Sequence, residues 1–113
     1  MRPESRKLLH DVLGSSEAVA SFTRGKSFED YKSDDLLRSA VERQLEIAGE
    51  ALNQLQKQDP DTASRIPGIR KVIDFRNILA HGYAALDDRV VWDIVLTHVP
   101  PLRHRVDDLL HVD

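Results

Sequence analysis

The segment from Leu36 to Leu55 constrains the fold more than any other part of this sequence. At 100° per residue, its apolar side chains fall within about half of a helical wheel. They are Leu36, Leu37, Ala40, Val41, Leu45, Ile47, Ala48, Ala51, Leu52 and Leu55. This spacing predicts one long amphipathic helix, and its apolar face requires other helices to cover it.

The composition agrees with an all-α fold. Charged residues make up 31% of the chain and aromatic residues only 5%, and the abundant Leu, Ala, Glu and Arg favour helices over strands. A length of 113 residues fits one packed core, so we expect a single helical domain over residues 1–113.

Three further helices are expected. Apolar spacing predicts a helix over residues 4–23, a helix that begins near Pro67 or Gly68, and an Asp-capped closing segment whose tail covers residues 102–110. Pro100 and Pro101 are expected to kink or break that closing segment. The helix after Pro67 is apolar over so wide an arc that we expect it to be the central helix of the bundle.

Charge, cysteine content and hydropathy exclude several functions. The chain has no cysteine, which rules out disulfides and thiolate chemistry. No run of about 18 apolar residues is present, so we expect a soluble, cytoplasmic protein that does not enter a membrane. A formal charge of -3 disfavours extended electrostatic binding to nucleic acid, and we expect no DNA partner.

The stretch DFRNILAHGY, residues 74–83, places polar residues inside an apolar helix. Arg76 emerges from the apolar stripe, where an unpaired charge costs several kcal/mol. It therefore needs an acidic partner, a subunit interface or a ligand such as phosphate. Tyr83, seven residues on, returns to almost the same face, whereas His81 points about 140° away if the helix continues.

Gly82 offers a way to end the helix at this point. A glycine there can adopt the left-handed conformation of a helix cap, which makes His81 part of the helix end. A histidine at that position can act as a general acid or base near neutral pH, and Arg76 beside it can hold a phosphate. A His-Gly pair is also a common helix cap, so spacing alone does not distinguish a site from a cap.

Arg43, Glu46 and Glu50 form a polar column on the long helix, at i, i+3 and i+7 spacing. Taken alone, such a column is typical of a solvated ladder of salt bridges.

The motif and its surroundings resemble a known family. RNILAHGY matches the Arg-x4-His-x-Tyr motif of the HepT-like toxins, which have HEPN domains. RSAVERQLEIAGEALNQL resembles that family's long helix with its R-x-x-E-x-x-G-E core, and residues 87–110 resemble its closing segment. The resemblance covers residues of about 5 to 111.

The resemblance implies an up-and-down bundle of four to five helices that forms a symmetric homodimer, with the motifs of both subunits facing a shared cleft. It also implies a metal-independent endoribonuclease without a cofactor, acting on RNA. In this scheme His81 assists attack of a ribose 2′-hydroxyl, Arg76 stabilises phosphoryl charge, and Asn77 orients phosphate or histidine. The column of Arg43, Glu46 and Glu50 then lines or braces the cleft.

The same resemblance implies a partner protein. HepT-like toxins are encoded beside a small nucleotidyltransferase antitoxin that neutralises them and can attach AMP to the motif tyrosine, here Tyr83. An added adenylate would block the cleft sterically and occupy the phosphate site.

Two other interpretations remain open. In the first, the protein is a non-catalytic helical dimer that binds nucleotide or the antitoxin. In the second, His98, His104 and His111 hold a metal ion. Their spacing is uneven and is interrupted by Pro-Pro, which favours scattered surface histidines, so we predict no metal site.

Overall fold

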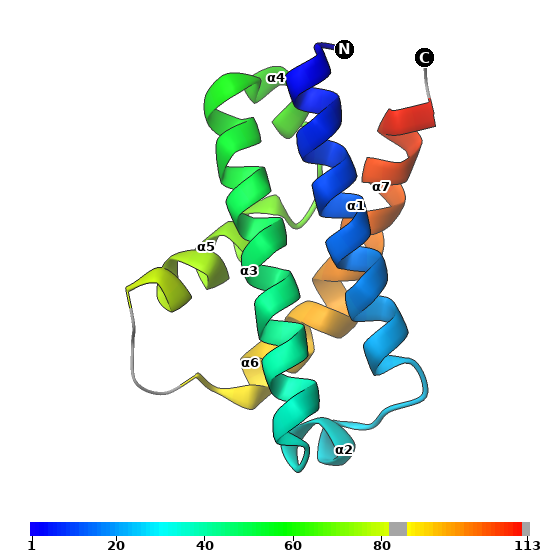
Figure 1. Ribbon diagram of the computed structural model, residues 1–113, viewed down its shortest axis with the longest axis vertical. Helices are drawn as coiled ribbons and strands as arrows, with labels where there is room; N and C mark the ends of the chain where they lie inside the picture. The colour runs from blue at the N-terminus through cyan, green and yellow to red at the C-terminus, as the bar shows by residue number, and fades with distance from the viewer. Residues whose placement is uncertain (82–85, 112–113) are drawn as a thin grey trace.

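The computed structural model describes residues 1–81 and 86–111, and the regular secondary structure of this part of the chain is entirely helical (Figure 1). Turns connect the helices, and the described residues contain no strand. The helical segments are α1 (Pro3–Thr23), α2 (Phe28–Lys32), α3 (Asp35–Gln58), α4 (Pro60–Ala63), α5 (Ile69–Ala80), α6 (Asp88–Asp93), the π-helical segment η1 (Ile94–His98) and α7 (Val99–His111).

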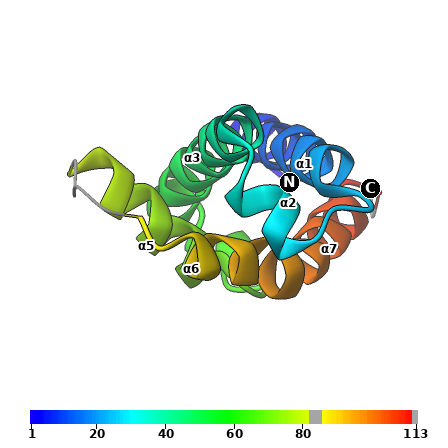
Figure 2. The ribbon, with the colours of Figure 1, turned by 90° about the horizontal axis from the view of Figure 1, so that it is seen from below.

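Three long helices, α1, α3 and α7, run along the long axis of the molecule, and α1 is antiparallel to both of the others (Figure 1). Seen along this axis, α1, α3, α6 and α7 surround the core, α2 closes the lower end, and α5 projects to one side (Figure 2). The all-α prediction is confirmed. The four to five expected helices correspond to α1, α3, α5 and the continuous α6–η1–α7 unit, to which the short α2 and α4 are added.

The core is mostly aliphatic and is built largely by the predicted faces, although Leu36, expected on the apolar face of the long helix, keeps 80% exposure. Its largest fully buried side chains are Tyr31, Leu9, Leu45, Leu52, Leu55, Leu102, Val12, Val19, Val41, Val72, Val91 and Val106. Tyr31 anchors the short α2, and the centroid of its ring lies 5.1 Å from the centroid of the Trp92 ring on α6. Among the described residues, no helix is both long and apolar enough to span a bilayer.

The central helix is α3, and the prediction that the motif helix would occupy this position is wrong. α3 packs against α1, α2, α4 and α5, whereas α5 packs mainly on α3 and η1. Only Val72, Ile73 and Phe75 of α5 are buried, and Ile78 near its end keeps 37% exposure. A helical wheel shows how wide an apolar arc is, but the tertiary fold decides how much of it the same chain covers.

The helix does not end at Pro100 and Pro101. η1 precedes them, and the N–H of Val99 donates to the carbonyl of Ile94, five residues back. A π turn of this kind changes the hydrogen-bond register just before two residues that have no N–H to donate. The chain therefore stays helical from α6 through η1 to α7, without a break at the two prolines.

Asp59, at the end of α3, is hydrogen-bonded to the start of α1 and caps α4. Its Oδ2 accepts hydrogen bonds of 2.7 Å from the hydroxyls of Ser5 and Thr62, and its Oδ1 accepts from the Thr62 N–H at 3.2 Å. These hydrogen bonds, that of Ser5 first, lower the pKa of Asp59 below its ordinary value of 3.8. The ionised form therefore stabilises the fold at pH values above about 4.

We expect Asp59→Asn to lower the free energy of unfolding by about 0.5–2 kcal/mol at pH 7, because it weakens a helix cap and a link between helices. A carboxylate with a depressed pKa loses its contribution as pH falls through that pKa, so the difference between variant and wild type shrinks below about pH 4. Urea denaturation at pH 7 and pH 3 measures both effects. Asp61→Asn, on the exposed side of α4, is the control, and an equal loss in both variants would contradict the role of Asp59.

Candidate active site

The site is built where α5 crosses α3, and Gly68 directs the chain into this crossing. Gly68 precedes α5 with a φ of 78°, a left-handed conformation that favours glycine. A Cβ at this position would lie 3.1 Å from the carbonyl oxygen of His98. Glycine therefore permits both the turn and the close approach of α5 to the end of η1.

Gly49 sets the distance between the two helices. A Cβ at Gly49 would lie 2.5 Å from the Cβ of Arg76 and 2.9 Å from the carbonyl oxygen of Val72, which is too close for any other residue without a shift of α5. Gly49 is the glycine of the R-x-x-E-x-x-G-E core, but the sequence alone assigned it no role. The available signal was a glycine in the interior of the strongest helical pattern, where it costs about 1 kcal/mol unless packing requires it.

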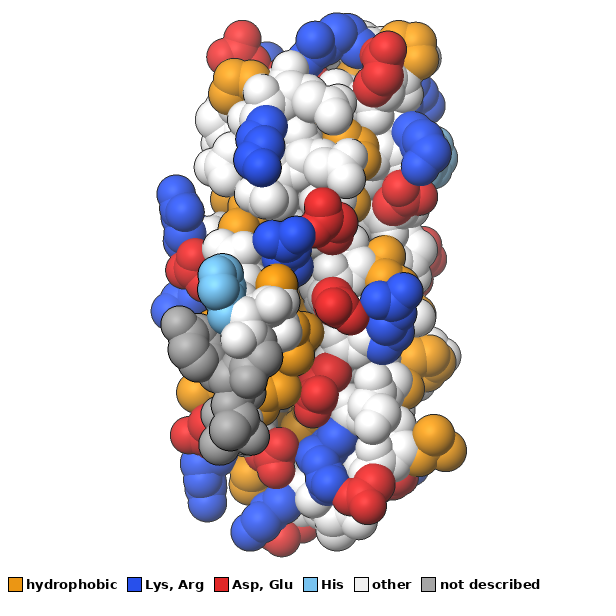
Figure 3. All heavy atoms as spheres, turned by 60° about the vertical axis from the view of Figure 1, so that its left-hand side comes forward, with side chains coloured by type: hydrophobic (Ala, Val, Ile, Leu, Met, Phe, Trp, Pro, Cys, Tyr) orange, Lys and Arg blue, Asp and Glu red, His pale blue; other side chains and the backbone are white. Residues whose placement is uncertain are grey.

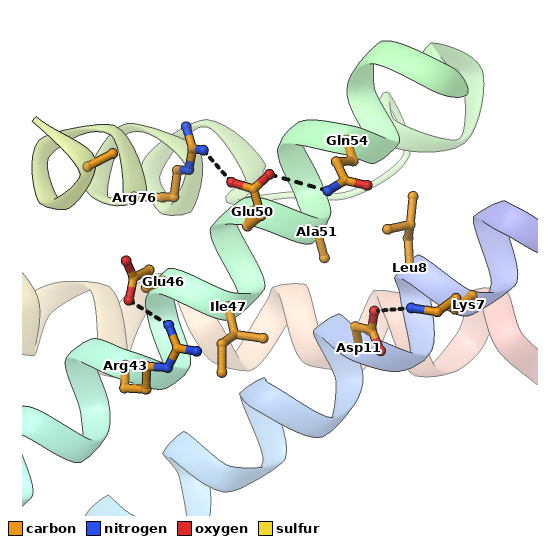
Figure 4. Close-up of a pocket in the computed structure, with 11 residues that line it drawn as sticks. Lys7, Leu8, Asp11, Arg43, Glu46, Ile47, Glu50, Ala51, Gln54 and Arg76 are labelled. Carbon is orange, nitrogen blue, oxygen red and sulfur yellow. Dashed lines mark hydrogen bonds and ion pairs between the residues drawn. The ribbon is translucent and has the colours of Figure 1, made fainter.

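Arg76 lies half-buried beside this crossing. Its Nη2 forms an ion pair with Oε2 of Glu50 (Figure 4). Its Nη1 donates to Oδ1 of Asn77 at 3.0 Å. Of the three partners expected for a partly buried arginine, the acidic residue is present within the chain. The guanidinium has five N–H donors, so these two contacts orient it without using its full capacity.

Glu50 is itself held in place from the other side. The amide Nε2 of Gln54 donates to its Oε1 at 3.3 Å. This hydrogen bond, and after it the charge of Arg76, lower the pKa of Glu50 below its ordinary value against the opposing effect of partial burial. Glu50 is therefore ionised at neutral pH and available to hold Arg76.

His81 caps the end of α5. Its backbone N–H donates to the backbone carbonyl of Asn77 at 3.1 Å, and its ring Nδ1 lies 2.7 Å from the same oxygen. Because a carbonyl oxygen only accepts, Nδ1 carries a hydrogen, and in the neutral ring the lone pair is on Nε2. This is the tautomer that a general base acting through Nε2 requires.

Arg76 and His81 do not share a face in one chain. His81 keeps the helical conformation, with φ of -88° and ψ of -1°, so its side chain leaves the helix in a direction far from that of Arg76. Asn77 contacts both residues, Arg76 through its side chain and His81 through its carbonyl. The turn expected at Gly82 and the hydroxyl of Tyr83 lie outside the described residues.

A groove of about 350 Å³ begins at Arg76 and crosses α3 to α1 (Figure 4). We call it the α3 groove. It is lined by Lys7, Leu8, Asp11, Arg43, Glu46, Ile47, Glu50, Ala51, Gln54, Arg76 and Ala80. The column of Arg43, Glu46 and Glu50 thus borders a concave surface, and Arg43 pairs with Glu46 at 3.0 Å. Their functional role remains a prediction.

The three C-terminal histidines are distributed over η1 and α7. His98, His104 and His111 each lie near an aspartate, at 3.7, 3.5 and 3.3 Å. Among residues 1–81 and 86–111, no group of three or more potential ligands from His, Cys, Asp and Glu gathers around one point.

The family model for ribonuclease HepT-like proteins matches residues 12–109 of this chain. The chain belongs to the HepT-like family. This match covers α3 and α5 completely, so both helices that carry the candidate site lie inside the family region.

Several curated relatives match over nearly their full length. A putative RNase of Caldanaerobacter subterraneus subsp. tengcongensis is 32% identical over 105 residues, which is 93% of either chain. A probable ribonuclease HepT of Thermococcus cleftensis is 32% identical over 109 residues, 96% of this chain and 98% of that protein. A putative RNase of Methanocaldococcus jannaschii is 30% identical over 102 residues, 90% of this chain and 93% of that protein. No solved structure matches the chain significantly.

We expect Gly49→Ala to destabilise this HepT-like chain by about 1–3 kcal/mol, because the added methyl group forces α5 away from α3. Gly14→Ala is the matched control, since Gly14 also lies inside a helix but a Cβ there meets nothing within 4 Å. That variant should gain about 0.5–1 kcal/mol from helix propensity alone. Chemical denaturation of both variants measures the contrast, and a stabilised Gly49→Ala protein would show that the crossing is not tight.

Proposed function

We propose that this protein is a metal-independent endoribonuclease and the toxin of a toxin-antitoxin pair. The observation that carries the proposal is the arrangement of Arg76, which Glu50 and Asn77 hold at the mouth of the α3 groove, five residues before His81 at the end of the same helix. Membership of a ribonuclease family and the RNase names of its relatives support the assignment.

The chemistry follows from these residue types. Nε2 of His81 accepts the proton of a ribose 2′-hydroxyl, whose oxygen attacks the adjacent phosphorus. The bond to the 5′-oxygen breaks and that oxygen takes up a proton from a general acid or from water, which leaves a 2′,3′-cyclic phosphate on one fragment and a 5′-hydroxyl on the other. Arg76 donates to the phosphoryl oxygens as their negative charge develops. No step of this scheme calls for a metal ion.

A symmetric homodimer would complete this site. Within one chain, His81 and Arg76 point in different directions, and His81 is not among the residues that line the α3 groove. A two-fold axis near the end of α5 would bring His81 of one copy toward Arg76 of the other and supply both a base and an acid. The same contact would cover Ile78, which is 37% exposed in the single chain.

The partner in this proposal is a small nucleotidyltransferase antitoxin. It would catalyse attack of the Tyr83 oxygen on the α-phosphorus of ATP, forming a tyrosyl adenylate and releasing pyrophosphate. Tyr83 is two residues from His81, so the added phosphate and adenine would exclude RNA from the same place.

A second candidate is a non-catalytic module that binds nucleotide or the antitoxin. The ion pair with Glu50 favours it, because it offsets the charge of Arg76 in the free protein. Such a protein would dimerise and bind its partner but leave RNA intact, so a cleavage assay distinguishes the two functions.

Arg76→Ala and His81→Ala should each lower the rate of RNA cleavage by about a hundredfold or more, since each removes a group that acts in the transition state. His104→Ala is the matched control, because His104 is an exposed histidine on α7 that pairs with Asp108. The assay uses purified, unmodified protein with a chelator present. Full activity in both site variants would refute the proposed site, and loss of wild-type activity in chelator would refute metal independence.

Co-expression with the antitoxin should add the mass of adenylate to the wild-type chain but not to Tyr83→Phe, which has no hydroxyl to attack ATP. Intact-mass spectrometry measures this directly. Tyr31→Phe is the control, because Tyr31 is fully buried and should leave the modification unchanged. An adenylate on the Tyr83→Phe chain would place the modification elsewhere.

A further inference from the structure

The α3 groove extends well beyond Arg76, and its far wall has no part in the proposed chemistry. Figure 4 shows Arg76 on α5 at one side and Lys7 and Asp11 on α1 at the other, with α3 between them. A volume of about 350 Å³ lies at the lower end of the range for small-molecule sites, which suits a ligand of nucleotide size.

The charges along the groove balance. Its lining contains three basic and three acidic side chains, and they form three pairs. Lys7 lies 3.1 Å from Asp11, Arg43 lies 3.0 Å from Glu46, and Arg76 pairs with Glu50. Acidic and basic groups are likewise interspersed over the face that carries α5 (Figure 3). A row of phosphates would gain no net attraction here, so the groove favours an uncharged group.

The floor of the groove is apolar. Ala51 and Leu8 are buried and Ile47 is half-buried, and together they form an aliphatic surface between the charged rims. Such a surface can accept the face of a flat ring, and the burial of that ring is favourable in proportion to the apolar area removed from water. Uncharged flat rings in an RNA strand are its bases.

Carboxylate oxygens on the rim select among bases. Asp11 and Glu46 are exposed enough to exchange their lysine and arginine partners for a ligand at low cost. An ionised carboxylate only accepts hydrogen bonds, so it suits the exocyclic amino group of cytosine, adenine or guanine. Uracil has no amino group, and its single N–H lies between two carbonyl oxygens that repel a carboxylate.

We propose that the α3 groove is a nucleobase-binding site that takes an amino-bearing base of the RNA, with the base on Ile47 and Ala51 and its amino group on Asp11 or Glu46. This inference rests on the proposed function, because it places the base next to the phosphate that Arg76 holds. The proposed base site would give the enzyme a preference for certain bases at the position where the RNA strand is cut.

The test compares cytidine 3′-monophosphate with uridine 3′-monophosphate by NMR titration of the wild-type protein. The two ligands share ring size, ribose and phosphate, so the contribution of Arg76 is the same for both. We expect both to shift the resonances of Ile47, Ala51 and Gln54, and the cytidine ligand to bind about tenfold more tightly, the effect of one hydrogen bond to a charged group.

Asp11→Asn and Glu46→Gln keep the side-chain volume but remove the charge. At least one of them should bring the ratio of the two affinities close to one, whereas Asp108→Asn on α7 should leave the ratio unchanged as the control. Equal binding of both ligands to the wild type, or no shift in the groove, overturns the proposal. A ratio unchanged in both variants also overturns it.

Two further outcomes distinguish this proposal from a dimer contact in the groove and from the ribonuclease function. If the same resonances respond to protein concentration instead of ligand, a second copy occupies the groove and the proposal is overturned. If the cytidine preference is found but RNA is not cleaved, the base site stands and the ribonuclease function fails. Sequencing of cleavage ends in an active preparation should show few uracils at the position that the groove reads.

Discussion

The close approach of α3 and α5 at Gly49 is the contact on which the rest of the site depends. Because Gly49 has no side chain, the backbone of α5 at Val72 and the Cβ of Arg76 can lie directly against α3. The next residue along α3 is Glu50, so the same contact that brings the helices together also brings an acid to the arginine. Gly68 allows the chain to enter α5 at the angle that this crossing needs.

The exposure of the Arg76 and Glu50 pair suggests how it can serve a binding site. The two side chains keep 26% and 43% of their exposure, so the pair is closer to a surface salt bridge than to a buried one. Pairs of that kind contribute about 0–1 kcal/mol to stability. The pair therefore fixes the position of the guanidinium, yet little free energy is lost when Glu50 is replaced as its partner. A phosphate can compete with the carboxylate for the same N–H donors.

Periodicity predicted the helices well because side-chain direction along one helix depends on local geometry alone. It placed the limits of α1 and α3 within a few residues, and it showed that Arg76 needed a partner. It did not show that the partner is Glu50, because the two residues are far apart in sequence and meet only through the packing of α3 on α5. For the same reason, the wide apolar arc of α5 was wrongly interpreted as a central position. The π turn of η1 was also missed, since two prolines in a helix predict a disruption but not the hydrogen-bond register that absorbs it.

The sparse positive charge of the site bears on how an acidic protein could act on RNA. Affinity that comes from counterion release grows with the number of phosphates that the protein neutralises. In the α3 groove, every basic side chain already has an acidic neighbour, and only Arg76 also lies at the proposed reaction centre. Even a two-fold dimer would bring only two such arginines to one cleft. In the proposed function, binding must therefore come largely from contacts to bases and ribose and from the shape of the cleft, and these are the contacts that can distinguish one RNA sequence from another.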